Sequence, residues 1–178
     1  MTIRLKPHQK IHIQSSSDIF HLLQPILRRS SKLDRDREHL WVLCLDQSHT
    51  VRHLELTGLG TLRSVLIDPV EVFSLALLKR AAAIALVHNH PSGRLIPSRA
   101  DRLATERLRE GSRFLNIPLL DHLIISETGF YSFADQGEFT DGQLIAADTA
   151  VRRARRDTLV ALPGIQITLD NGTRYAFM

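Results

Sequence analysis

A short histidine motif at the end of an apolar run constrains this chain more than any other feature. Residues 81–87 are alanine, isoleucine, leucine and valine, the pattern of a buried strand, and His88-Asn89-His90 follows directly. Side chains two residues apart on a strand point to the same side, so His88 and His90 can converge on one ion. The motif therefore predicts a strand whose end forms half of a binding site.

The residues after the motif predict a turn into a helix that brings a carboxylate back over the strand end. Two prolines and a glycine lie in the 91–97 loop, Ser98 is placed as a helix N-cap, and Asp101 stands at the third helical position. Two imidazoles and one carboxylate suit zinc and leave its fourth position open for water. We therefore predict His88, His90 and Asp101 as the ligands of one zinc ion per chain.

The spacing His-x-His-x7-Ser-x2-Asp resembles the JAMM signature of the JAB/MPN metalloprotease superfamily, and neighbouring segments resemble its RadC-like branch. These segments are His-Asn-His-Pro-Ser-Gly at 88–93, Leu-Asp-His-Leu-Ile-Ile at 120–125, Gly-Phe-Tyr-Ser-Phe at 129–133 and Arg-Glu-His-Leu-Trp-Val-Leu-Cys-Leu-Asp at 37–46. The resemblance covers roughly residues 16 to 135. It implies an α/β (α+β) cytidine-deaminase-like MPN fold, with a mixed β-sheet flanked by helices.

The resemblance also implies two catalytic residues. Glu38 matches the family's upstream glutamate, which would act as general base toward a zinc-activated water. Glu55 and Glu71 are the competing glutamates, and Glu38 is favoured because it precedes the strand that resembles the family's first core strand. Ser98 would steady the oxyanion of a tetrahedral intermediate, although Ser-x-x-Asp at a helix start is also an ordinary capping arrangement.

We divide the chain into an N-terminal arm at 1–15, a RadC-like metal-dependent hydrolase domain at 16–135 and a C-terminal extension at 136–178. Relatives carry an N-terminal helical region, expected to be a helix-hairpin-helix module, which this chain is expected to lack. The family also tends to have Pro-Arg-Glu where this chain has Pro69-Val70-Glu71, so no role of that arginine is carried over.

Periodicity predicts the elements around the motif. Helices are expected from a cap at 16–18, from Pro69 to about 82 and from 99 to about 114, with strands at 40–45, 51–56, 62–67, 119–126 and 130–133. Pro25 predicts a kink or an early break in the first helix. Residues 1–14 suggest a loose arm or an edge strand, and 142–156 has helical character. Asn171-Gly172 between alternating runs predicts a β-hairpin.

Composition excludes several classes of protein. The single cysteine, Cys44, rules out internal disulfides and a multi-cysteine zinc site, and its apolar surroundings predict an inert core thiol. No stretch is apolar enough to span a membrane or to act as a secretory signal, so a cytoplasmic protein is expected. The net charge of +4 permits contact with nucleic acid without demanding it.

The leading hypothesis is a zinc hydrolase that cleaves peptide or isopeptide bonds in a protein or peptide substrate. The alternative is a DNA-repair-associated protein that binds or processes nucleic acid, as the name of the RadC-like family suggests. Its contact would be the basic cluster at 152–156, although a solvated helix face is the simpler interpretation. That cluster comprises Arg152, Arg153, Arg155 and Arg156.

Three further alternatives bear on the metal site. A non-catalytic scaffold with a structural zinc is disfavoured by the complete ligand set and Glu38. His-Asn-His in a row does not match HNH nucleases, which spread those residues over a ββα unit, and a zinc deaminase would need a Pro-Cys-x-x-Cys motif that is absent. Asp121-His122 is interpreted as a core polar pair, one member of which could orient a metal-binding histidine.

Overall fold

The computed structural model describes residues 2–5, 11–139, 166–168 and 174–176. Its strands form a sheet in the order β6-β5-β4-β2-β3-β1-β7-β8. Their bounds are β1 (Thr2–Leu5), β2 (His39–Leu45), β3 (Val51–Leu59), β4 (Ala83–Asn89), β5 (Leu119–Ile125), β6 (Phe130–Ser132), β7 (Gln166–Thr168) and β8 (Arg174–Ala176). The helices are α1 (Ser16–Arg29), α2 (Lys32–Arg35), α3 (Pro69–Leu78) and α4 (Arg99–Leu115).

The sheet is mixed, as predicted, and β4 lies inside it, between β5 and β2. Strand β4 pairs antiparallel with β2 on one side and parallel with β5 on the other. Every residue of β4 is buried, which explains why its sequence is continuously apolar up to the histidine motif. The parallel pairing requires a crossover between β4 and β5, and α4 provides it.

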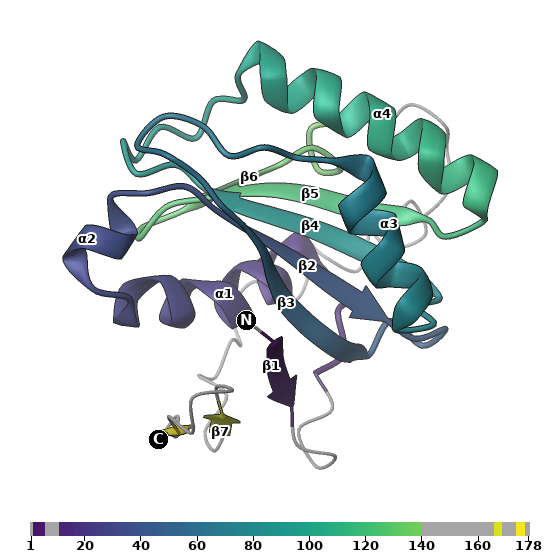
Figure 1. Cartoon of the computed structure of the whole chain (residues 1–178), viewed down its shortest axis with the longest axis horizontal. Coiled ribbons are helices and arrows are strands. Elements are labelled where there is room, and N and C mark those ends of the chain that lie inside the picture. Colours follow the sequence, from purple (N-terminus) through teal and green to yellow (C-terminus); the bar gives the residue numbers. More distant parts are fainter. Residues whose placement is uncertain (1, 6–10, 140–165, 169–173, 177–178) are drawn as a thin grey trace, which may run out of the picture.

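Helices cover both faces of this sheet, with α1 on one face and α3 and α4 on the other (Figure 1). Alternate residues of β4 feed the two cores. Ala83, Ala85 and Val87 pack in the cluster that includes α1, whereas Ile84 and Leu86 pack in the cluster that includes α3 and α4. The same alternation places His88 on the α3/α4 face and Asn89 on the α1 face.

The first helix differs from its prediction in two details. Its N-cap is Ser15, one residue before the predicted cap, and Asp18 completes a capping box with it. Pro25 lies inside the helix, which continues to Arg29, so the predicted early break is wrong. Burial of Leu22, Leu23 and Leu27 against the sheet outweighs the one backbone hydrogen bond that proline removes.

The strand predicted at 62–67 is wrong. Residues 60–68 instead form an irregular connection between β3 and α3. Both sides of β3, the strand before this segment, are already paired, with β2 and with β1, so the segment cannot extend the sheet beside β3. Its apolar residues Leu62 and Leu66 are exposed, and its backbone turns back toward Glu38 through the bonds Glu38 N–H to Thr61 O and Gly60 N–H to Glu38 O.

The ends of the described chain lie at one side of the sheet. β1 pairs with both β3 and β7, so the alternative of a strand at the N-terminus is correct, although it is not an edge strand. The predicted hairpin is confirmed by the antiparallel pairing of β7 with β8. The turn predicted at Asn171-Gly172, the helical character predicted for 142–156 and the arginine cluster concern residues outside the described ones. In the described part, no helix combines the length and apolar character needed to cross a membrane.

Cys44 lies in β2, fully buried in the core between the sheet and helices α3 and α4. Burial raises the pKa of its thiol to about 11, and the nearby charge of Glu55 adds to the shift. The thiol is therefore protonated at neutral pH, and the prediction of an inert core cysteine is confirmed.

Candidate metal centre

The three predicted ligands converge at the carboxyl end of β4 and the start of α4. The Nε2 atoms of His88 and His90 are 3.0 Å apart. Nε2 of His88 is 3.2 Å from Oδ1 of Asp101, and Nε2 of His90 is 3.6 Å from Oδ2 of the same carboxylate. In a tetrahedral zinc site with bonds of 2.0–2.1 Å, ligand atoms are about 3.3 Å apart. The donor atoms therefore fit one small cation.

Local sequence sets the position of Asp101. Ser98 is the N-cap of α4, and its Oγ accepts the backbone N–H of Asp101 at 3.2 Å. In return, the backbone N–H of Ser98 donates to Oδ2 of Asp101 at 2.7 Å. This capping box confirms the predicted helix start and holds the carboxylate over the strand end. A role of the Ser98 hydroxyl toward a substrate stays a prediction.

His90 is also oriented by a neighbour in sequence. Its Nδ1 is 2.8 Å from the backbone carbonyl oxygen of Arg94. A carbonyl oxygen can only accept, so Nδ1 carries the proton and Nε2 presents its lone pair to the centre. The loop between them turns at Gly93, whose φ of 73° lies in the left-handed region, as the predicted tight turn requires.

The charges of the centre are strongly coupled. Burial alone would raise the pKa of Asp101, but the adjacent imidazoles of His88 and His90 and the hydrogen bond from Ser98 outweigh burial and hold that pKa far below its ordinary value. Burial lowers the pKa of His90, yet its bonds to Asp101 and to the Arg94 carbonyl produce a net increase. Asp101 is therefore a carboxylate at any ordinary pH, and a second proton taken up by His90 at Nε2 would have to leave before a metal ion could bind there.

Glu38 lies beside this group. The antiparallel register pairs Leu40 with His88, and extending it by two residues places Glu38 across from His90. The side chain is only 7% exposed, and a backbone hydrogen bond from Val65 reaches its carboxylate. Burial raises its pKa, the charge of Asp101 adds to the increase, and the two histidines oppose it.

The competing glutamates lie elsewhere. Glu55 is on β3, where it pairs with Lys79 at 3.7 Å. Glu71 is exposed in the first turn of α3. Neither is among the charges that affect the pKa of Asp101 or His90 most, whereas Glu38 raises the pKa of His90. Glu38 is thus the one of these three glutamates that lies beside the histidines, and its role as general base stays a prediction.

Asn89, between the two histidines, points to the opposite face of the sheet, as the alternation of side chains along a strand requires. Its Oδ1 accepts the backbone N–H of His39 at 2.7 Å, and its Nδ2 donates to the carbonyl of Arg37 at 3.0 Å. These are the two residues that flank Glu38. One amide side chain thus links the histidine strand to the backbone on both sides of the glutamate.

The structure separates the two roles left open for Asp121-His122. The ring of His122 is the one in contact with the centre, because its Nε2 is 2.9 Å from Nδ1 of His88. Asp121 instead accepts from Ser132 Oγ at 2.6 Å and from the Ala134 N–H at 3.0 Å, which ties β5 to the turn after β6. Burial raises the pKa of Asp121 to about 7.

Sequence reasoning missed Thr105, which lies 2.6 Å from the other ring nitrogen of His122. Thr105 follows Asp101 by four residues on α4, so both lie on the same face of the helix. That spacing was the available signal, and it becomes informative only once Asp101 is placed as a ligand.

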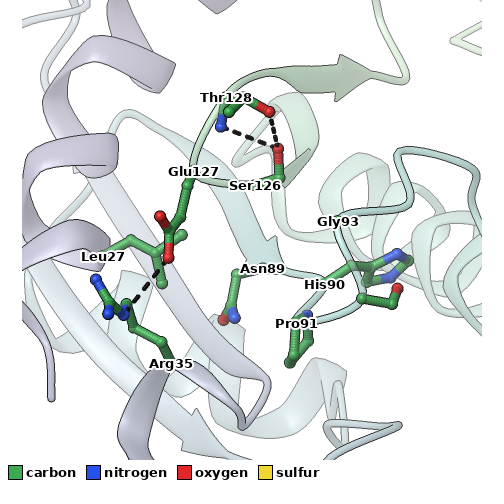
Figure 2. A pocket seen from close by; sticks show the side chains of 10 residues that line it. Leu27, Arg35, Asn89, His90, Pro91, Gly93, Ser126, Glu127 and Thr128 are labelled. Atoms are coloured by element: carbon green, nitrogen blue, oxygen red, sulfur yellow. Dashed lines mark hydrogen bonds and ion pairs between the residues drawn. The ribbon is translucent and has the colours of Figure 1, made fainter. Parts of the chain in front are cut away.

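A hollow of about 230 Å³ adjoins the loop after β4, on the side of the sheet that carries α1 (Figure 2). In this view Asn89 lies between His90 and an ion pair formed by Arg35 and Glu127, whose charged atoms are 3.5 Å apart. The other residues that line the hollow are Leu27, Pro91, Ser92, Gly93, Ser126 and Thr128. Of the three predicted ligands, His90 is the one that borders this hollow.

Comparison with known proteins gives the family. Residues 13–138 match the model of the RadC-like JAB domain. The chain belongs to this family. All the residues of the centre, from Glu38 to His122, lie inside the match. The resemblance stated from the sequence motifs is thus confirmed for the family and for its mixed sheet flanked by helices.

Curated relatives of this RadC-like JAB domain include UPF0758 proteins. One from Pelodictyon phaeoclathratiforme is 42% identical over 125 residues, which cover 70% of this chain and 54% of the relative. One from Methanosarcina barkeri is 37% identical over 128 residues, covering 72% and 54%. One from Flavobacterium johnsoniae is 39% identical over 127 residues, covering 71% and 53%. The chain therefore spans about half the length of these relatives, whose name states no reaction.

Proposed function

We propose that this RadC-like JAB domain is a zinc-dependent hydrolase that cleaves peptide or isopeptide bonds in a protein or peptide substrate. One observation carries the proposal: three donor groups of the type that zinc prefers converge within 3.6 Å of one another, beside a buried carboxylate. When bound, a zinc ion supplies an activated water at neutral pH and polarises a carbonyl oxygen.

The chain's own residues would move the proton. Glu38 takes a proton from the attacking water and delivers it to the leaving nitrogen of the cleaved amide. Burial, which raises the pKa of Glu38, brings the carboxylate closer to the range in which a general base works best at neutral pH. Asn89 holds the backbone on both sides of Glu38, and Ser98 is the candidate donor to the oxyanion.

The experiment is Glu38→Gln in the full chain, with Glu71→Gln as the matched control. We expect Glu38→Gln to keep its zinc and to lose turnover by roughly 10²- to 10⁴-fold, because general acid–base catalysis contributes about that factor. Glu71→Gln makes the same chemical change on an exposed helix turn, and we expect it to keep full turnover. Zinc content is measured by mass spectrometry, and turnover with a library of quenched fluorescent peptides and isopeptide-linked lysine conjugates.

Full turnover in Glu38→Gln would remove Glu38 from the mechanism. A zinc-loaded wild-type chain that cleaves neither class of bond would contradict the proposed hydrolase activity. The alternative of a DNA-repair-associated protein stays a prediction, because the arginines on which it depends lie outside the described residues.

A further inference from the structure

A buried chain of hydrogen bonds connects the metal-binding histidine of β4 to the first turns of α4. Nδ1 of His88 is 2.9 Å from Nε2 of His122. Nδ1 of His122 is 2.6 Å from Oγ1 of Thr105. Oγ1 of Thr105 is in turn 2.6 Å from the backbone carbonyl oxygen of Asp101. This series of hydrogen bonds therefore begins at one predicted metal ligand, His88, and ends at the backbone carbonyl of another, Asp101.

The last group in this chain determines where every proton lies. The Asp101 carbonyl can only accept, so the single hydroxyl proton of Thr105 is used there. The Thr105 oxygen must then accept from Nδ1–H of His122. Neutral imidazole carries one N–H, so Nε2 of His122 is an acceptor, and it takes the proton of Nδ1 of His88.

The surroundings of His122 keep it neutral and fixed. The side chain is fully buried, and its two ring nitrogens face an imidazole and a hydroxyl rather than a carboxylate, so a second proton would leave a buried cation without an anionic partner. Its ring stacks on Phe133 at a centroid distance of 4.9 Å and an interplanar angle of 5°. In a neutral ring held in one plane, the nitrogen that donates fixes the other nitrogen as an acceptor. The hydrogen bond at Thr105 therefore determines the direction of the hydrogen bond at His88.

We propose that Thr105 and His122 are positioning residues that hold His88 in the tautomer with Nδ1 protonated and Nε2 free to bind a metal ion. The opposite tautomer would place a proton on Nε2, which faces His90 and Asp101 at 3.0 and 3.2 Å, and would block the metal position. The inference rests on the metal site of the proposed function. It does not depend on which bond the protein cleaves.

Thr105→Val and Thr105→Ser form the matched pair that tests this inference. Valine has nearly the shape of threonine but lacks the hydroxyl, so Nδ1–H of His122 loses its buried acceptor. His122 is then free to carry its proton on Nε2, which would force His88 into the blocking tautomer. Serine keeps the hydroxyl and both hydrogen bonds. We expect zinc affinity to fall by about 10- to 100-fold in Thr105→Val and to stay near the wild-type value in Thr105→Ser.

Two measurements read the effect without any enzyme assay. Zinc affinity is measured at pH 7.5 by competition with a chromophoric chelator, using the full chain. The tautomers of His88 and His122 are assigned in the metal-free chain from long-range ¹H–¹⁵N correlations. Wild type and Thr105→Ser should show Nδ1–H on both rings, and Thr105→Val should show a change on both.

Unchanged tautomers and unchanged zinc affinity in Thr105→Val would overturn the inference. His122→Phe is the second variant should Thr105→Val not fold: it keeps the stacked ring and removes the acceptor, and zinc affinity equal to wild type there would also overturn it. If the wild-type chain binds zinc but cleaves no substrate, the hydrolase proposal fails and the affinity difference still decides the inference. If the wild-type chain binds no zinc, the proposed zinc site is rejected, and the tautomer measurement alone decides the inference.

Discussion

The two histidines of the centre are two residues apart and are held in opposite ways. His88 belongs to the buried end of β4, where it is fully buried and its second nitrogen contacts His122 on the neighbouring strand. His90 lies just past the strand, at the edge of the hollow, and its second nitrogen contacts the carbonyl of Arg94 in the following loop. One ligand depends on distant residues, and the other depends on its own loop.

The difference shows how one metal centre can have a buried side and a side that is open to solvent. Asp101 resembles His90, since Ser98, three residues away, holds its carboxylate. The buried side of the centre is therefore set by packing between strands and α4, whereas the exposed side is set by a loop and a helix cap. The accessible side of the centre is the one that local sequence controls, since the side chains of His90 and Asp101 are 12% and 11% exposed, whereas that of His88 is fully buried.

The largest expected effect comes from removing either histidine. We expect His88→Ala and His90→Ala both to lose bound zinc, since each deletes one of three protein ligands. Their metal-free forms should differ. His88→Ala leaves a cavity and an unpaired Nε2 on His122, which should lower the free energy of unfolding by about 2–4 kcal/mol. His90→Ala should change it by less than about 1 kcal/mol.

Metal content by mass spectrometry and urea unfolding of the metal-free proteins measure the two effects. Equal losses of stability in the two variants would contradict the comparison, because they would mean that the loop histidine is as deeply integrated as the strand histidine.

A smaller effect is expected from pH. In the metal-free protein the pKa of His90 is raised, so its contribution to stability is complete below its ordinary pKa of about 6.5 and is lost as pH rises through the raised value. The depressed pKa of Asp101 acts oppositely: its contribution is complete above about pH 4 and is lost on further acidification. Zinc replaces the His90 proton, so the gain in Tm on adding zinc should be larger at pH 8 than at pH 6.

Thermal unfolding with and without zinc at both pH values measures this dependence. The variant Glu38→Gln gives a second test of this pH dependence, because Glu38 contributes to the raised pKa of His90. The loss of zinc should begin at a lower pH in that variant, and a zinc gain that is the same at pH 6 and pH 8 in the wild type would refute the coupling.

The smallest effect is expected at the helix cap. Ser98→Ala removes the acceptor for the Asp101 N–H and should cost about 1 kcal/mol of stability, while Ser98→Thr keeps a capping hydroxyl and should cost less. Urea unfolding measures both. If turnover also falls in Ser98→Ala by far more than zinc affinity does, the hydroxyl acts on the substrate as well as on the helix, and parallel losses would leave Ser98 as a cap alone.

Most elements were predictable because their signals are local. The apolar run before His88, the Ser98–Asp101 box and the alternating residues around β7 and β8 each lie within a few positions of one another. The strand at 62–67 was predicted wrongly because strand formation needs a partner, and both sides of β3 were already paired. Of the kink or early break predicted at Pro25, the early break is wrong, because the burial of this helix depends on the sheet.

The same division runs through the centre itself. The sequence alone predicted that His88, His90, Asp101 and Ser98 lie close together, because strand alternation and helix capping act over two to three residues. Only the tertiary structure decided that His122, 34 residues from His88, and Thr105, 17 residues from His122, complete its buried side. Which ring nitrogen of an imidazole carries the proton depends on which acceptor lies within about 3 Å of it. The sequence does not give the distance between side chains that are far apart along the chain.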